Sequence, residues 1–472
     1  MAAISHRDRS RERAESALRC AVGKVACHRR CRCSTGPTAA AQESWRAALP
    51  SQRAAVLRRA GALWDEHAGE IQDWIVREAG SIPAKAALET AIAAQECYEA
   101  AALPTHPVGD VLPSNEPRWS LARRRPAGVV TVIAPFNLPL ILSIRSVAPA
   151  LALGNAVLLK PDPRTTVSGG IALIQVLRAA GLPDGLLQLL PGGREIGEAT
   201  ITATEVRVVS FTGSTEAGRA VGALGAQHLK RTHLGLGGNS ALIVLPGADL
   251  AKAVSAGAFG SFMHQGQICM ATGRQLVHES LHDAYVDALA ARADHLPVGD
   301  PAGGPVALGP IIDHAQLGKI DGIVRESVAS GARLAAGGIH EGLFYRPTVL
   351  AEVSPEMTAW REEIFGPVAP VLPFASTDEA IKIASDTGYG LSLGILGDVG
   401  QGMQIADAIP SGIVHVNEQT VSDEANVPFG GVGSSGNGSR FGGSQANIEA
   451  FTETQWLTVR RDIAPYPAKG KA

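Results

Sequence analysis

The chain has 472 residues, of which 45% are hydrophobic, and a formal net charge of −3 at pH 7. This length suggests two or three domains, each able to bury its own core. The near-neutral charge argues against nucleic acid or an anionic membrane as the main partner, and no apolar run reaches the roughly 18 residues of a membrane-spanning helix. We therefore expect a cytoplasmic protein.

Residues 1–36 differ in composition from the rest of the chain. They hold four of the six cysteines and much Arg, His and Ser, with few large apolar residues. Such a segment cannot bury enough surface to fold alone, and its cysteine spacing lacks paired Cys-x-x-Cys units of a zinc site. Asp8, Glu12 and Glu15 count against a mitochondrial or plastid targeting signal. We expect a disordered or mis-assigned leader and no metal site.

The body of the chain alternates helical and strand patterns. Apolar residues recur at three- and four-residue steps from Ala41 to Ala79, which predicts helix, whereas Pro104 to Ser120 is loop-like. Short apolar runs separated by helical stretches follow at residues 128–134, 156–159, 186–190, 206–210 and 241–245, and a second alternation runs from residue 250 to 416. This pattern predicts an α/β fold with parallel sheets covered on both faces.

One cysteine is predicted to lie in a turn between a helix and a strand. Residues 250–264 have a helical pattern, residues 274–278 a strand pattern, and Cys269 falls between them. A thiol with a pKa near 8.5 is only about 3% thiolate at pH 7, so a nucleophilic cysteine needs donors or positive charge nearby. His264 and Arg274 are close in sequence. The alternative role is that of a small buried hydrophobic residue.

The segment Gly266-Gln-Ile-Cys269, with Arg274 after it, resembles the active-site segment of the NAD(P)-dependent aldehyde dehydrogenase superfamily. Six other blocks resemble the superfamily in the same order: Ala134-Pro-Phe-Asn137, Leu159-Lys160-Pro161, Ser210-Phe-Thr-Gly-Ser214, Leu236-Gly-Gly238, Glu362-Glu-Ile-Phe-Gly-Pro367 and Pro428-Phe-Gly-Gly431. Within it, Lys160-Pro-Asp-Pro-Arg-Thr165 and Ser439-Arg-Phe-Gly-Gly443 are most similar to the benzaldehyde and vanillin dehydrogenases, which act on aromatic aldehydes.

The resemblance implies an aldehyde dehydrogenase-like α/β fold with three parts. We expect a Rossmann-type NAD(P)-binding domain at residues 37–106 and 125–232, and an α/β catalytic domain at residues 233–416. Residues 107–124 and 417–472 would form a small β oligomerisation arm and the C-terminal segment. The implied assembly is a homodimer or homotetramer.

The expected cofactor site combines a helix start with residues implied by the resemblance. Gly213 and Ser214 follow a predicted buried strand and open a helix, so backbone N–H groups and the helix dipole can meet a pyrophosphate; a plain turn is the alternative. By resemblance Lys160 contacts the adenosine ribose, Glu363 and Phe365 hold the nicotinamide ribose and ring, and Phe136 belongs to the same set. NAD-selective members often have an acid at the position of Pro163, so we expect NAD as cofactor, with NADP as an alternative.

The expected chemistry is oxidation of an aldehyde at Cys269. The resemblance implies attack by its thiolate to give a thiohemiacetal, hydride transfer to the nicotinamide, and hydrolysis of a thioester. The Asn137 amide, in isolation a typical turn residue, would stabilise the oxyanion with the Cys269 N–H, contributing about 3 kcal/mol. Five apolar residues could line a substrate tunnel or equally belong to the core: Leu138, Ile141, Leu142, Met263 and Phe429.

One position departs from the family pattern. The Glu that serves as general base, immediately before Leu-Gly-Gly, is replaced by Gly235. Loss of a general base typically costs about 10²- to 10⁴-fold in rate, so we expect impaired deacylation. The alternatives are an enzyme that releases its acyl group to coenzyme A, and a catalytically poor subunit that retains cofactor and assembly surfaces.

Overall fold

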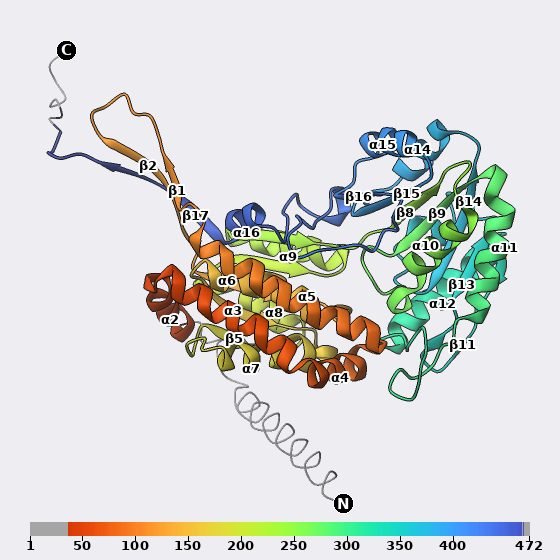
Figure 1. The fold of residues 1–472 in the computed structure, drawn as a ribbon, viewed down its shortest axis with the longest axis horizontal. Coiled ribbons are helices and arrows are strands. Elements are labelled where there is room, and N and C mark those ends of the chain that lie inside the picture. The colour runs from red at the N-terminus through yellow and green to blue at the C-terminus, as the bar shows by residue number, and fades with distance from the viewer. Residues whose placement is uncertain (1–35, 465, 467–472) are drawn as a thin grey trace, which may run out of the picture.

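The structure is a computed structural model that describes residues 36–464 and 466. Apart from Gly36, the leader expected at residues 1–36 lies outside these residues. Two sheets, one parallel and the other parallel except for its edge strand, lie side by side with helices on both faces of each. A narrow β arm projects from the first (Figure 1). None of the helices formed by the described residues combines the length and apolar character that a bilayer crossing requires. The expected α/β architecture is confirmed.

The first sheet has five parallel strands in the order β5-β4-β3-β6-β7. From one edge to the other they are β5 (Leu187–Leu189), β4 (Ala156–Lys160), β3 (Val129–Ile133), β6 (Val206–Thr212) and β7 (Arg231–Gly235). The chain adds β4 and β5 on one side of β3 and then crosses to add β6 and β7 on the other. Open α/β sheets bind ligands beyond the carboxyl ends of the strands at such a switch point.

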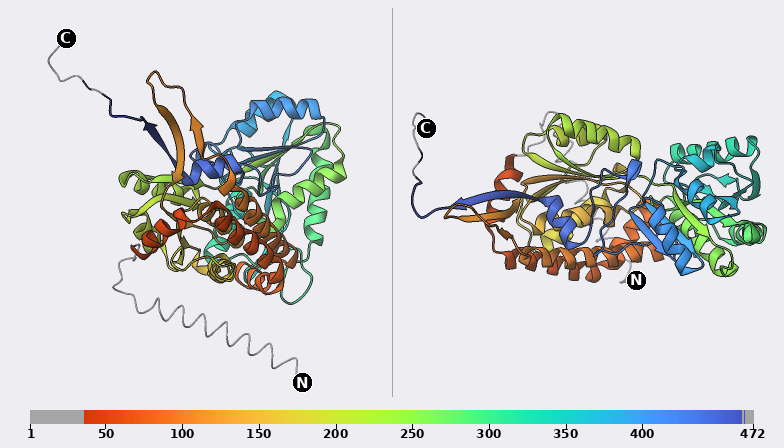
Figure 2. Two further views of the ribbon diagram at one scale, coloured as in Figure 1. Left: turned by 60° about the vertical axis from the view of Figure 1, so that its left-hand side comes forward. Right: turned by 90° about the horizontal axis from the view of Figure 1, so that it is seen from above.

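Helices cover both faces of this sheet, as Figure 2 shows. Alternate strand residues such as Val130 and Val132 pack with one helical layer, and Val129 and Ile133 pack on the opposite face with α8 and α9. The helical pattern expected from residue 41 to 79 is three helices, because the chain breaks before Pro50 and at His67. The helices are α2 (Gly36–Ala47), α3 (Pro50–Glu66), α4 (Ala68–Ala79), α5 (Pro83–Ala102), α6 (Pro139–Ala152), α7 (Ala172–Ala179), α8 (Arg194–Thr202) and α9 (Thr215–Gln227).

The second sheet has seven strands in the order β10-β13-β14-β9-β8-β15-β16, and β10 is the antiparallel one. They are β8 (Ser240–Val244), β9 (Thr272–His278), β10 (Arg333–Ala336), β13 (Thr348–Ala351), β14 (Val368–Phe374), β15 (Ser392–Leu396) and β16 (Ile413–Val416). One face packs against α10 (Leu250–Phe262) and α11 (Glu279–His295). The other packs against α12 (His314–Ala329), α13 (Thr358–Arg361), α14 (Thr377–Ser385) and α15 (Val399–Ala408). The strands β11 (His340–Glu341) and β12 (Phe344–Tyr345) form a small hairpin.

The arm is a three-stranded antiparallel sheet of β1 (Gly109–Val111), β2 (Trp119–Pro126) and β17 (Thr452–Val459), which follows α16 (Ser444–Phe451). The β2–β17 ladder pairs Thr452 with Pro126 at one end and Val459 with Trp119 at the other. Because the arm stands clear of the body (Figure 1), Trp119 and Trp456 remain 66% and 64% exposed.

Candidate active site

The Cys269 loop connects α10 to β9 at the amino edge of the second sheet. A strained turn, η4 (Met263–Gly266), ends the expected helix two residues early, because His264 and Gln265 have left-handed φ values of 48° and 56°. Gly266 also has a positive φ, and a Cβ there would lie 2.1 Å from the carbonyl oxygen of Gly366. The turn is held by the Gln265 Nε2, which donates to the carbonyls of Gly80 and Pro310 at 2.9 Å.

Cys269 packs against a cluster of aromatic and aliphatic side chains, and the name Cys269 pocket refers to this cluster of side chains. Its buried members are Ile268, Met270, Leu391, Phe429 and Phe441, with Leu138 and Met263 packed against them. Three predicted substrate residues, Leu138, Met263 and Phe429, therefore belong to the same cluster as Cys269. The other two, Ile141 and Leu142, are buried in α6 and are not members of this cluster among the described residues.

The environment of the thiol is apolar and negative. Burial, with the charges of Glu363 and Asp423, raises the pKa of Cys269 to about 12. The two side chains that were expected to supply positive charge, Arg274 and His264, do not offset this rise in the pKa of Cys269. Arg274 donates to the carbonyls of Asn239 and Ala384 at 3.0 and 3.1 Å, and burial and the Lys85 charge hold the pKa of His264 well below its ordinary value. This environment therefore favours the thiol over the thiolate.

A buried ion pair from α5 holds the segment that carries Asn137. Lys85 Nζ contacts the carboxylate of Glu89 and donates to the carbonyl oxygen of Asn137 at 2.7 Å. The other Glu89 oxygen accepts from the Leu140 N–H at 3.1 Å, at the start of α6. The pair thus fixes both ends of the turn that follows β3. Since Leu138 belongs to the Cys269 pocket, this turn brings Asn137 to the neighbourhood of the thiol.

Four predicted cofactor residues converge on the carboxyl edge of the first sheet. Phe136 follows β3, Lys160 ends β4, and Gly213 and Ser214 connect β6 to α9; these are neighbouring parallel strands. Ser214 caps α9 by accepting the Ala217 N–H at 3.3 Å. An amine, a helix N-terminus and an aromatic ring at the switch point fit an anionic dinucleotide with flat rings.

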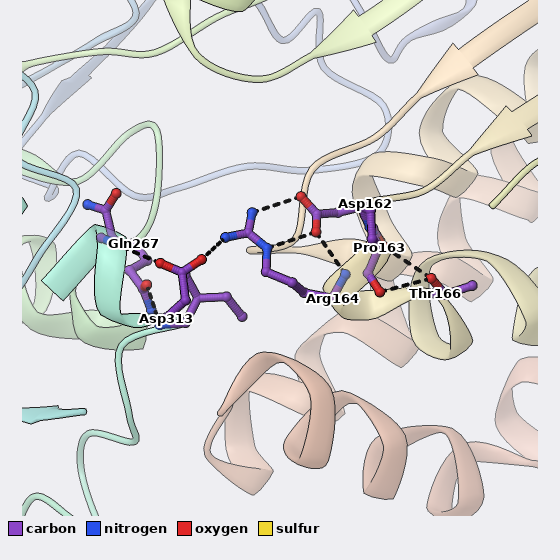
Figure 3. Close-up of polar contacts among 8 residues, drawn as sticks. Asp162, Pro163, Arg164, Thr166, Gln267 and Asp313 are labelled. Carbon is purple, nitrogen blue, oxygen red and sulfur yellow. Dashed lines mark hydrogen bonds and ion pairs between the residues drawn. The ribbon is translucent and has the colours of Figure 1, made fainter. Parts of the chain in front are cut away.

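Several carboxylates lie at this edge of the first sheet and partly neutralise its positive charges. The pKa of Lys160 is lowered by burial, while the charges of Asp162 and Glu195 act in the opposite direction. Arg164 pairs with Asp162 at 2.8 Å, and its other end contacts Asp313 from the segment before α12 (Figure 3). The guanidinium carbon also lies 4.3 Å from the Phe136 ring centroid. Arg164 therefore links the two sheet units beside the cofactor edge, with its charge already paired.

The two remaining predicted cofactor residues, Glu363 and Phe365, precede β14 and face the same region. The Phe365 ring meets Phe136 edge-to-face at 5.9 Å. Glu363 is half-buried, and its desolvation raises its pKa to about 7; its Oε1 accepts the Gly238 N–H at 3.0 Å. A Cβ on Gly238 would lie 2.5 Å from the Cys269 carbonyl oxygen, so Gly238 fits between the carboxylate and the cysteine loop.

Gly235 ends β7, three residues before Gly238. Its carbonyl accepts the Gly213 N–H at 3.0 Å, so the base position is joined to the expected pyrophosphate turn. A Cβ at Gly235 would lie 3.1 Å from Phe441 Cε2 and 3.3 Å from Thr212 Oγ1. Phe441 belongs to the Cys269 pocket, so this position adjoins the site.

Comparison with known proteins agrees with this geometry. The sequence model of the Aldehyde dehydrogenase family matches residues 34–457. The chain belongs to the aldehyde dehydrogenase family. It is 64% identical over 435 residues to a vanillin dehydrogenase of Amycolatopsis, covering 92% of this chain and 90% of the relative. It is 46% identical to a benzaldehyde dehydrogenase of Pseudomonas putida that is named for NAD(+), covering 90% and 88%.

Solved structures of aldehyde dehydrogenases share the fold. The structure of a salicylaldehyde dehydrogenase from Pseudomonas putida G7, complexed with salicylaldehyde, superposes with a TM-score of 0.88 at 35% identity, covering 92% of this chain and 91% of that one. A lactaldehyde dehydrogenase structure gives 0.87 at 32% identity, covering 90% of each chain. The expected aldehyde dehydrogenase-like fold is confirmed, and the chain is an NAD(P)-dependent oxidoreductase of this family.

Two groups of buried charges in this aldehyde dehydrogenase were missed by sequence reasoning. One is the Lys85–Glu89 pair, and the other joins Arg145 to Glu96 and Asp423. Arg145 is the single charged residue of α6, which is apolar apart from Ser143 and Ser146, and this signal could have marked Arg145 as paired and buried.

Proposed function

We propose that this aldehyde dehydrogenase oxidises an aromatic, benzaldehyde-like aldehyde to the carboxylic acid with NAD(P). The observation that carries the proposal is the Cys269 pocket, where the thiol adjoins the buried rings of Phe429 and Phe441. Flat aromatic substrates match such walls, because offset and edge-to-face ring pairs are favourable. The relatives named for vanillin, benzaldehyde and salicylaldehyde support the same substrate class.

The residues divide the reaction between them. The Cys269 proton passes to solvent, and the thiolate attacks the aldehyde carbon, giving a thiohemiacetal whose oxyanion is stabilised by the Asn137 amide and the Cys269 N–H. When bound, the oxidised nicotinamide supplies the hydride acceptor, and Lys160, Gly213, Ser214, Glu363, Phe365 and Phe136 would hold the cofactor. The resulting thioester on Cys269 is then hydrolysed by water.

Deacylation is the slow step in this proposal, because Gly235 presents no carboxylate to the attacking water. Loss of a general base removes about 10²- to 10⁴-fold in rate, or roughly 3 to 5.5 kcal/mol. The same absence favours a second candidate function, transfer of the acyl group to coenzyme A. A third reading, a cofactor-binding subunit of poor activity, predicts no turnover with any aldehyde.

The sheet units and the arm have assigned tasks. Residues 37–106 and 125–232 bind the cofactor, and residues 233–416 carry the thiol. Residues 107–124 and 417–472 form the oligomerisation arm and the C-terminal segment, and the arm joins copies into a homodimer or homotetramer. The exposed Trp119 and Trp456 on the arm support a partner surface. For the cofactor we propose NAD first, with NADP also accepted, since Pro163 leaves no acid at the position used by NAD-selective members.

The test is stopped-flow NADH formation with benzaldehyde, at enzyme concentrations that resolve one turnover, with Gly235→Glu alongside. A burst of about one NADH per site, followed by a slow phase that the Glu variant accelerates about 10²-fold or more, supports the proposal. Coenzyme A that accelerates the slow phase of the parent would instead favour acyl transfer. Bound NAD without NADH from any aldehyde would favour the third reading.

A further inference from the structure

A buried charge cluster lies directly beside the Cys269 pocket. Arg145, at the centre of α6, donates through Nε to Glu96 of α5 at 2.8 Å, and its Nη2 lies 2.6 Å from Asp423 Oδ2. The Arg145 and Glu96 side chains are only 2% and 1% exposed. Burial alone would lower the pKa of Arg145, but the charges of Asp423 and Glu96 raise it above its ordinary value, so the cation persists.

Three buried polar atoms of this cluster have no hydrogen bond among the described residues: Arg145 Nη1, Arg145 Nη2 and Asp423 Oδ1. Of these, Nη2 has its ion pair with Asp423 Oδ2 at 2.6 Å. An unsatisfied buried donor or acceptor costs about 1–3 kcal/mol, more when it is charged, so a ligand or water is expected to fill the gap. Of the two atoms outside the ion pair, Arg145 Nη1 is a donor and Asp423 Oδ1 is an acceptor, and the Arg145–Asp423 ion pair joins the residues that carry them.

The position of the charge cluster indicates which ligand would bind to its unpartnered atoms. The Arg145 guanidinium carbon lies 5.1 Å from the centroid of Phe429, a buried member of the Cys269 pocket. The charge of Asp423 acts on the Cys269 thiol, which places the carboxylate near the reacting sulfur. A substrate whose aldehyde carbon meets Cys269 and whose ring meets Phe429 would therefore bring its ring substituents towards Arg145 and Asp423.

We propose that Asp423 and Arg145 form a specificity-determining subsite for an oxygen substituent on the ring of the aromatic aldehyde. A phenolic hydroxyl satisfies both orphan atoms, since it donates to Asp423 Oδ1 and accepts from Arg145 Nη1. A methoxy oxygen can only accept, and a methyl group can do neither. The proposal rests on the proposed function and narrows it to ring-oxygenated benzaldehydes, with hydroxyl preferred over methoxy and methoxy over methyl.

The experiment compares kcat/KM for 4-hydroxy-, 4-methoxy- and 4-methylbenzaldehyde, and for the matching 3-substituted series, in the full chain with NAD. Hydroxyl and methyl groups have similar size, so their ratio isolates the polar contact. We expect a hydroxyl-to-methyl ratio of at least about 10 in one series, as sites built to hydrogen-bond a hydroxyl strongly reject the analogue that lacks it. A ratio near one in both series overturns the proposal, and this comparison needs no variant.

Asp423→Asn tests the assignment to Asp423, and Glu424→Gln, an exposed neighbouring acid, is the matched control. Removing the Asp423 charge changes the pKa of the Cys269 thiol for every substrate alike. This effect cancels in the ratio of kcat/KM between two aldehydes. The hydroxyl-to-methoxy ratio should fall towards one in Asp423→Asn and stay at the parental value in Glu424→Gln. Equal loss with both aldehydes means a merely structural role and overturns the assignment.

Failure of the underlying function would look different. If 4-methylbenzaldehyde and benzaldehyde give NADH but hydroxyl brings no advantage, the aromatic aldehyde dehydrogenase stands and the subsite fails. If no member of either series gives even a single-turnover burst, both proposals are overturned together.

Discussion

The buried pair of Lys85 and Glu89 should stabilise the fold as a unit and hold Asn137 for catalysis. Lys85→Met leaves the Glu89 carboxylate buried without its cation, a change that typically costs about 3–5 kcal/mol. It also removes the charged donor to the Asn137 carbonyl at 2.7 Å. Lys85→Met with Glu89→Gln removes the charge as well, while a Gln oxygen can still accept the Leu140 N–H. We therefore expect the double variant to recover at least about 1 kcal/mol relative to Lys85→Met.

The assay is urea denaturation followed by fluorescence, together with the single-turnover rate of NADH formation. Lys252→Met is the control, because its side chain is 86% exposed and its ion pair with Asp249 should contribute no more than about 1 kcal/mol. In the double variant stability should return in part while the turnover rate stays low, since the donor to Asn137 is still missing. The reasoning is refuted if Lys85→Met is as stable as the control, or if the double variant is less stable than Lys85→Met.

Three other outcomes follow from the site. Because the pKa of Cys269 is raised to about 12, alkylation of the cofactor-free enzyme by iodoacetamide should accelerate about tenfold per pH unit from pH 7 to 10 without a plateau, with Cys269→Ser as the blank; a plateau near pH 8.5 would contradict this. Asn137→Ala should lower the single-turnover rate about 10²- to 10³-fold with NAD binding by titration unchanged, whereas a change in KM alone would exclude the oxyanion role. Glu195→Gln, which removes a negative charge acting on Lys160, should raise the NADP-to-NAD ratio of kcat/KM roughly five-fold, and an unchanged ratio would place the 2'-phosphate elsewhere.

The sequence predicts the layered framework well because its signals are local. Apolar runs such as residues 206–210 and 241–245 match β6 and β8 to within one or two residues at their ends. The Cys269 loop was likewise predicted as a link between a helix and a strand. What the pattern could not show is the strained turn at His264 and Gln265, whose left-handed backbone depends on contacts with Gly80, Pro310 and Gly366.

The buried charges were beyond sequence reasoning for a related reason. Lys85 and Glu96 lie in an Ala-rich helix, where charged residues ordinarily face solvent. The Asn137 carbonyl that Lys85 contacts lies 52 residues away in the chain, and the Arg145 that pairs with Glu96 lies 49 residues away. Asp423 lies in a loop without periodicity. The cations expected to activate Cys269 were inferred from closeness in sequence, and Arg274 shows the weakness of that inference, since its donors are used by the carbonyls of Asn239 and Ala384.

The arm also constrains the order of folding. Arg123 of β2 donates to Gln455 of β17, and these residues are 332 positions apart in the chain. Pairing over such a separation carries a large loop-closure cost and is slow to form. On the ribosome β2 must wait for β17 until nearly the whole chain has been synthesised, by which time both sheets can have formed. Any contact between copies that uses this arm is therefore withheld from incomplete chains.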